Sequence, residues 1–80
     1  MKNATRPTRT AYELGQTIRA VRKSQRLTQK DLASLMGAGS RLLTDIERGK
    51  PTAQVGKILL ALDLLGIDLL LVERGSDSHG

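Results

Sequence analysis

Eighty residues, 39% of them hydrophobic, make one domain with a modest core, so we expect a second copy of the chain to add buried area. The chain has no cysteine and Tyr12 is its only aromatic residue, which excludes disulfides, thiolate metal sites and a core built on aromatic rings. The formal net charge is +5, and residues 1–50 hold eleven Lys and Arg against four Asp and Glu; this one-sided charge predicts a polyanionic partner such as nucleic acid, with a merely soluble basic surface as the alternative.

Residues 1–9 form a flexible basic arm in this interpretation, because they are polar and interrupted by Pro7. A frayed terminus and an arm that enters a DNA minor groove both fit this composition. The first helix is expected from about Ala11 to Gln25, with Thr10 as its N-cap and Glu13 completing a capping box. Apolar residues at helical spacing predict its buried face: Leu14, Ile18 and Val21.

Two short helices follow. One is predicted from a Thr28 N-cap to about Met36, with Asp31 opposite Thr28 in a second capping box. The segment Gly37–Gly39 ends it, and the next helix is expected from about Ser40 to Arg48. Their predicted inward residues are Leu32, Ala33, either Leu35 or Met36, Leu43 and Ile46.

The pattern of the C-terminal third predicts one more helix, followed by a segment in which the helical spacing of apolar residues ends. The helix is expected to be capped by Thr52 and to end near Leu65, with a buried stripe of Val55, Ile58, Leu59 and Leu62. Five of the six residues 67–72 are aliphatic, which favours a β-strand buried on both faces over a fifth helix, the alternative. No second strand is visible, so we expect residues 67–74 to pair across a dimer and residues 75–80 to be disordered.

The segment from Leu27 to Lys50 has the spacing of a helix-turn-helix motif, with two short helices around a glycine-bearing turn. Ala33 is small where the helices cross, and Gly37 suits a left-handed exit from the first of them. Leu43 and Ile46 anchor the second helix from behind. Its opposite face is then free to enter a DNA major groove: Ser40, Arg41 and Thr44.

This pattern resembles the lambda-repressor-like, or XRE, helix-turn-helix family over about residues 14–66. The matching residues are Ile18, Arg22, Leu27-Thr28-Gln29, Leu32-Ala33, Gly37, Ile46-Glu47 and Gly49. The run IERGKPT, the helix QVGKILLALDLLG and the aliphatic segment after it are similar to HipB-type antitoxins, the DNA-binding partners of kinase-like HipA toxins. The resemblance implies an all-α fold of four or five helices with a C-terminal β-strand paired across a dimer, and an ion pair between Arg22 and Glu47.

Eight residues are predicted to bind DNA: Thr28, Gln29, Lys30, Ser40, Arg41, Thr44, Arg48 and Lys50. In the family, the position of Gln29 contacts a phosphate or buttresses the recognition helix. Arg41 suits a guanine edge or a phosphate equally well, whereas Ser40 and Thr44 read bases less specifically.

The remaining residues of this group have simpler roles. Thr28 is first a helix cap and only then a phosphate contact, Lys30 adds nonspecific charge, and Arg48 and Lys50 hold backbone phosphates. Two neighbouring residues are unusual for a helix face that meets DNA, one because it is apolar and the other because it is acidic. Leu42 either touches a thymine methyl or packs within the protein, and Asp45 either faces away from DNA or accepts a hydrogen bond from a cytosine amino group.

The predicted function is a double-stranded-DNA-binding repressor dimer on an inverted-repeat operator, acting as the antitoxin of a HipA-like kinase toxin and autoregulating its operon. A stand-alone XRE-type regulator is the alternative. No catalytic residue, cofactor or metal site is expected, since His79 is the only histidine, and RNA is disfavoured because no aromatic platform exists. Because no long apolar run follows the charged N-terminus, we expect no membrane association and a cytoplasmic protein.

Overall fold

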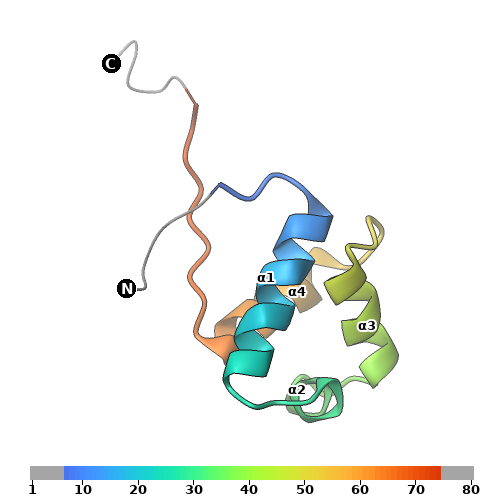
Figure 1. Cartoon of the computed structure of the whole chain (residues 1–80). Helices are drawn as coiled ribbons and strands as arrows, with labels where there is room; N and C mark the ends of the chain where they lie inside the picture. Colours follow the sequence, from blue (N-terminus) through green and yellow to red (C-terminus); the bar gives the residue numbers. More distant parts are fainter. Residues whose placement is uncertain (1–6, 75–80) are drawn as a thin grey trace.

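The computed structural model describes residues 7–74, in which four helices form a single cluster (Figure 1). The bounds are α1 (Ala11–Ser24), α2 (Gln29–Leu35), α3 (Ser40–Arg48) and α4 (Val55–Leu65). Helix α1 packs chiefly against α3, and α4 packs against both α1 and α2. Residues 1–6 of the predicted arm and the predicted disordered tail 75–80 lie outside the described residues.

The first two helices begin at the predicted caps. At α1 the Thr10 hydroxyl accepts a hydrogen bond from the Glu13 N–H, which is the first half of the predicted capping box. The second half is wrong, because the Glu13 carboxylate accepts from the Arg9 N–H and not from the Thr10 N–H. At α2 both halves form between Thr28 and Asp31. The Thr28 N–H and then its hydroxyl hold the pKa of the exposed Asp31 carboxyl below its usual value.

The core is aliphatic, as the composition requires. Ile18, Leu32 and Leu43 from three different helices are fully buried and pack in one cluster. Of the two alternatives for the end of α2, Met36 is the buried residue, whereas Leu35 is 62% exposed. The burial of these apolar side chains away from water is the main contribution that holds the helices together.

Two predictions for α4 are wrong. The helix begins at Val55 after the N-cap Gln54, and Thr52 lies in the turn before it. Val55 and Leu59 are 69% and 46% exposed, and the buried residues of α4 are Ala61, Leu62 and Leu65. Leu62 alone of the predicted stripe is fully inward, and Ile58 is partly buried. Because α4 is apolar on nearly every side, helical periodicity cannot select the face that packs.

Residues 67–73 have no regular secondary structure in the single chain, so the alternative of a fifth helix is wrong and the predicted strand is not formed here. Ile67 still packs against the core, with its N–H bonded to the Leu62 carbonyl. Beyond it the chain leads away from the helices (Figure 1), and Leu71 and Val72 are 88% and 82% exposed. A strand needs backbone partners, and the described part of one chain offers none.

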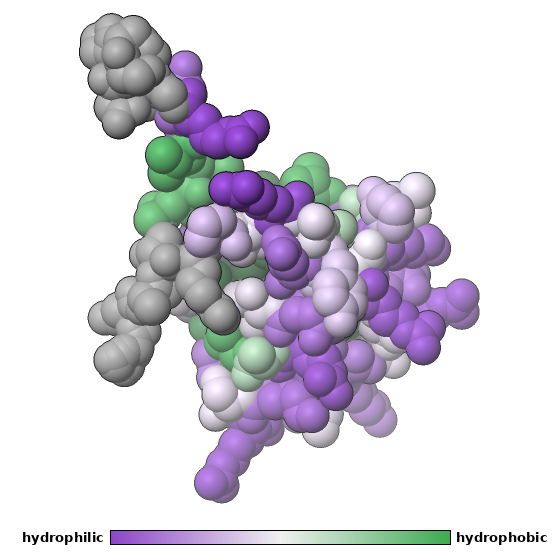
Figure 2. All heavy atoms as spheres, turned by 45° about the horizontal axis from the view of Figure 1, so that its top comes forward, coloured by the Kyte–Doolittle hydropathy of each residue, from purple (hydrophilic) through white to green (hydrophobic). Residues whose placement is uncertain are grey.

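The apolar side chains of the C-terminal segment gather at one end of the molecule, while hydrophilic side chains cover most of the helical body in the view of Figure 2. Within residues 7–74 no helix is both long enough and apolar enough to cross a membrane.

Gly15 sets the distance between α1 and α3, which the sequence patterns did not reveal. It is buried, and a Cβ built on it would overlap the carbonyl oxygen of Ile46 and lie 2.7 Å from that of Glu47. The end of α3 therefore rests directly on the backbone of α1. Only glycine permits this approach.

We predict that Gly15→Ala lowers the free energy of unfolding by about 2–4 kcal/mol, because α3 must move away from α1. Gly56→Ala in α4 is the matched control, since a Cβ there meets nothing within 4 Å. It should stabilise the protein by about 0.5–1 kcal/mol through its better helix propensity. Urea unfolding followed by circular dichroism measures both, and equal stability of the two variants would contradict the close packing of Gly15.

Candidate nucleic-acid interface

Helices α2 and α3 form the predicted helix-turn-helix arrangement. Gly37 has a left-handed backbone with φ of 70°, as predicted, and the Ala38 N–H bonds to the Ala33 carbonyl across the turn. Ala33 is 2% exposed, which fits its predicted place between the helices. Of the two alternatives for Leu42, packing is the one seen, because it lies against the core cluster. The other face of α3 is left open.

A buried ion pair fixes the end of α3 to α1, as the family resemblance implied. Arg22 Nε lies 2.7 Å and Nη2 lies 3.0 Å from the two carboxylate oxygens of Glu47, and both side chains are almost fully buried. The third donor, Arg22 Nη1, bonds to the carbonyl of Leu27 at 2.7 Å. One guanidinium thus joins α1, α3 and the loop before α2 through a fork-shaped geometry that lysine cannot reproduce.

Gln29 extends this network from Glu47 to Thr44 of α3. Its amide Nε2 donates to Glu47 Oε1 at 3.0 Å, and its Oε1 accepts from the Thr44 hydroxyl at 3.0 Å. Gln16 of α1 donates to the Glu47 carbonyl from the other side. Of the two family roles for Gln29, buttressing is thus visible in the structure. Gln16 was not predicted, and nothing in its local pattern marks it.

Charged side chains occupy the exposed face of α3 and the residues after it. The side chain of Arg41 is 89% exposed, with Nε 4.0 Å from Asp45 Oδ1, and Lys50 Nζ lies 3.5 Å from Asp45 Oδ2. Asp45 therefore lies between two cations, which offsets its negative charge on this face. Exposed pairs of this kind are weak, so both cations can exchange Asp45 for another anion.

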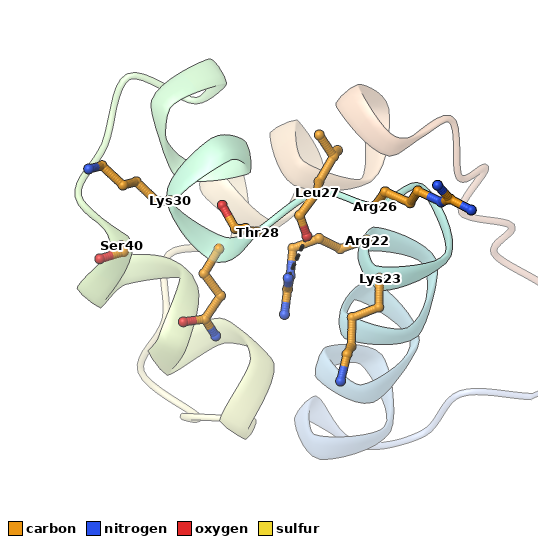
Figure 3. A pocket seen from close by; sticks show the side chains of 8 residues that line it. Arg22, Lys23, Arg26, Leu27, Thr28, Lys30 and Ser40 are labelled. Atoms are coloured by element: carbon orange, nitrogen blue, oxygen red, sulfur yellow. Dashed lines mark hydrogen bonds between the residues drawn. The ribbon is translucent and has the colours of Figure 1, made fainter.

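Two shallow grooves flank this face. In the first, Lys30 and Ser40 lie on one side and Lys23 and Arg26 on the other, with Arg22 and Thr28 between them (Figure 3). The second groove is lined by Tyr12, Gln16, Arg19, Gln29, Thr44, Glu47 and Arg48. Gln29 contributes to both grooves.

Six of the eight predicted residues therefore line these grooves, whereas Arg41 and Lys50 lie outside both and flank Asp45. Lys23 and Arg26 join the predicted residues only in the folded chain, because the turn after α1 brings them beside the start of α2. The result is a polar surface with several cations from α1, α2 and α3, which is the charge pattern of a polyanion-binding face.

Comparison with known proteins agrees with this geometry. Residues 13–75 match the family described as a helix-turn-helix domain. A relative from Sinorhizobium fredii (strain NBRC 101917 / NGR234), described as the uncharacterized HTH-type transcriptional regulator y4mF, is 48% identical over 67 residues, which cover 84% of this chain and 88% of the relative. The chain therefore belongs to the helix-turn-helix family of DNA-binding transcriptional regulators, which is not a class of enzymes.

Two solved structures have the same fold as this chain. HipB in a complex with an O2 20mer superposes with a TM-score of 0.80 at 17% identity, covering 89% of this chain and 99% of that one. The HipA–HipB–O2–O3 complex gives a TM-score of 0.79, also at 17% identity, covering 88% of this chain and 99% of that chain. At this identity the likeness shows that the fold is HipB-like.

We predict that Glu47→Gln lowers the free energy of unfolding by about 3 kcal/mol, because it leaves the buried Arg22 guanidinium without a counter-charge. The double variant Arg22→Met/Glu47→Leu should recover most of that loss, since an apolar pair carries no desolvation penalty. Exposed Arg19→Met is the control and should change stability by less than about 0.5 kcal/mol. Chemical denaturation of the four proteins measures this, and a double variant no more stable than Glu47→Gln would contradict it.

Proposed function

We propose that the chain is a sequence-specific transcriptional repressor that binds an inverted-repeat operator as a homodimer, with α3 in the major groove of double-stranded DNA. The observation that carries this proposal is the anchoring of α3. Its inner face is fixed by Leu43, Ile46 and the buried Glu47, while Ser40 and Arg41 on its outer face are exposed. A rigid helix with a free polar face is what direct readout of base edges requires. We propose a cytoplasmic location for this repressor.

Each predicted residue has a role in this proposal. Arg41 at the start of α3 reads a guanine edge, with Ser40 beside it and Thr44 one turn further along the helix. The cations on both sides hold the phosphate backbone: Lys30, Arg48 and Lys50 as predicted, together with Lys23 and Arg26 of the first groove. Thr28 and Gln29 at the start of α2 add polar phosphate contacts, and Gln29 also supports α3.

We infer that residues 67–72 pair with the same segment of a second copy to form a two-stranded ribbon. The segment supports this because it is extended away from the helices and because Leu70, Leu71 and Val72 are all more than two-thirds exposed. Three consecutive aliphatic side chains exposed to water form a contiguous apolar patch, and removing such a patch from water lowers the free energy. Pairing would cover them and would provide partners for the backbone groups of the segment.

The HipB-like fold supports a second, compatible role, in which the chain is an antitoxin that restrains a HipA-like kinase toxin. The sequence run around IERGKPT and the HipA–HipB–O2–O3 structure favour it. A stand-alone regulator fits the relative from Sinorhizobium fredii equally well. The gene neighbourhood discriminates the two: an adjacent HipA-like reading frame favours the antitoxin, and its absence favours the stand-alone regulator.

The DNA-binding proposal is tested by titrating the protein against its own upstream DNA and against random DNA at two salt concentrations. We expect tight, specific binding that weakens steeply with salt, because phosphate contacts release counterions. Arg41→Ala should lose about 1–3 kcal/mol of sequence preference. Lys57→Ala on α4, which lines neither groove, should behave as wild type. Binding to upstream DNA no tighter than to random DNA would overturn autoregulation.

The pairing of residues 67–72 is tested by sedimentation equilibrium. The wild-type chain should be dimeric, and Leu71→Asp/Val72→Asp should be monomeric, because two charges cannot be buried in an apolar ribbon. Leu35→Asp is the control, since Leu35 is a similarly exposed leucine on α2, remote in sequence from this segment. A dimer that survives the double substitution would place the interface elsewhere.

A further inference from the structure

The Thr44 hydroxyl has one hydrogen and two acceptors for it inside the protein. Its Oγ1 lies 3.0 Å from the Ser40 carbonyl oxygen, one turn earlier in α3, and 3.0 Å from Gln29 Oε1 of α2. Neither oxygen carries a hydrogen of its own, so both contacts depend on the hydrogen of Thr44. Whichever of the two receives it, that hydrogen is used within the chain.

The oxygen and the NH2 group of the Gln29 side-chain amide cannot exchange places, so Gln29 cannot become a donor to Thr44. Glu47 already accepts two hydrogen bonds from Arg22, so its carboxylate is an acceptor only. The group of Gln29 that faces Glu47 Oε1 at 3.0 Å must therefore be the NH2 group, which leaves the Oε1 oxygen facing Thr44. The buried ion pair thus determines the direction of the hydrogen bond at the outer end of the network.

We propose that Thr44 contacts DNA as a hydrogen-bond acceptor only, and therefore selects a base that presents an amino group in the major groove. This inference rests on the proposed function, in which α3 enters that groove. Thr44 is partly exposed and lines the second groove, so the lone pairs of its oxygen can reach a ligand there. A free threonine would accept or donate and would read several bases, but here only acceptance remains.

Only two bases meet this requirement. Adenine presents N6–H2 and cytosine presents N4–H2 in the major groove, whereas guanine O6 and thymine O4 are acceptors. A carbonyl oxygen opposite the Thr44 oxygen would bring two acceptors together without a hydrogen between them, which costs a buried unsatisfied group. Every base pair holds one such amino group, on adenine or on cytosine, so acceptance by Thr44 selects the strand that carries the amino group at one position of each half-site, and thereby the orientation of that base pair.

The experiment is a selection of bound sequences from random duplex DNA, carried out with the full-length wild type and with Thr44→Val. Valine keeps the shape and the methyl group but removes the oxygen. We expect wild type to enrich one orientation of the base pair at one position per half-site, with adenine or cytosine rather than thymine or guanine on one defined strand, and Thr44→Val to make that position indifferent while the other preferences remain. The affinity for the best site should fall about five- to tenfold, as expected for one net hydrogen bond. Thr44→Ser should keep the preference.

Two further variants guard against a loss of structure. Thr17→Val removes a comparable hydroxyl bond to the preceding helical turn, from Thr17 to the Glu13 carbonyl in α1, and should leave the selected sequences unchanged. Thr44→Ala, which favours helix, replaces valine if Thr44→Val unfolds.

The outcomes separate the two proposals. A wild type that enriches no sequence overturns both. An enriched sequence that Thr44→Val leaves unaltered overturns the acceptor role of Thr44 and leaves the repressor function standing. The same conclusion follows if, at the position whose preference Thr44→Val abolishes, wild type selects A·T and T·A, or G·C and C·G, equally.

Discussion

The Glu47 carboxylate is the point at which three helices are joined. It extends from α3, accepts two hydrogen bonds from Arg22 of α1, and accepts a third from Gln29 of α2. A buried pair of this kind adds little net stability, because desolvation of the charges offsets most of their attraction. The pair instead fixes the orientation of α3, because the two parallel hydrogen bonds from Arg22 to Glu47 form only when α3 has one particular rotation about its axis. The exposed face of α3 follows from that rotation.

The close contact of Gly15 with the last turn of α3 complements this pair. The hydrogen bonds determine the rotation of α3, and the missing Cβ determines its distance from α1. Neither feature touches a ligand in the proposed function. Both hold the recognition helix rigid, so that binding DNA would not require the helix to be ordered first.

Charge and apolar surface are divided between two parts of the molecule. Cations from the end of α1, the start of α2 and the residues after α3 border the exposed face of α3, while the two most exposed aliphatic residues, Leu71 and Val72, lie in the segment after α4. The division supports the proposed function, in which one surface meets DNA and the other meets a second copy of the chain. Because the two surfaces involve different elements, each can be altered without the other.

The sequence by itself determined the four helices and the helix-turn-helix motif, because caps at Thr10 and Thr28, glycine stops and apolar spacing act within a few residues. It also named, as DNA-binding residues, six of the fourteen residues that line the two grooves. Tertiary structure alone decided which face of the uniformly apolar α4 packs, that Gly15 is a helix contact, and that Lys23 and Arg26 lie beside α2. Each of these depends on contacts between residues distant in the chain, which local patterns of side chains do not encode. The same holds for residues 67–72, since a strand exists only through its partner.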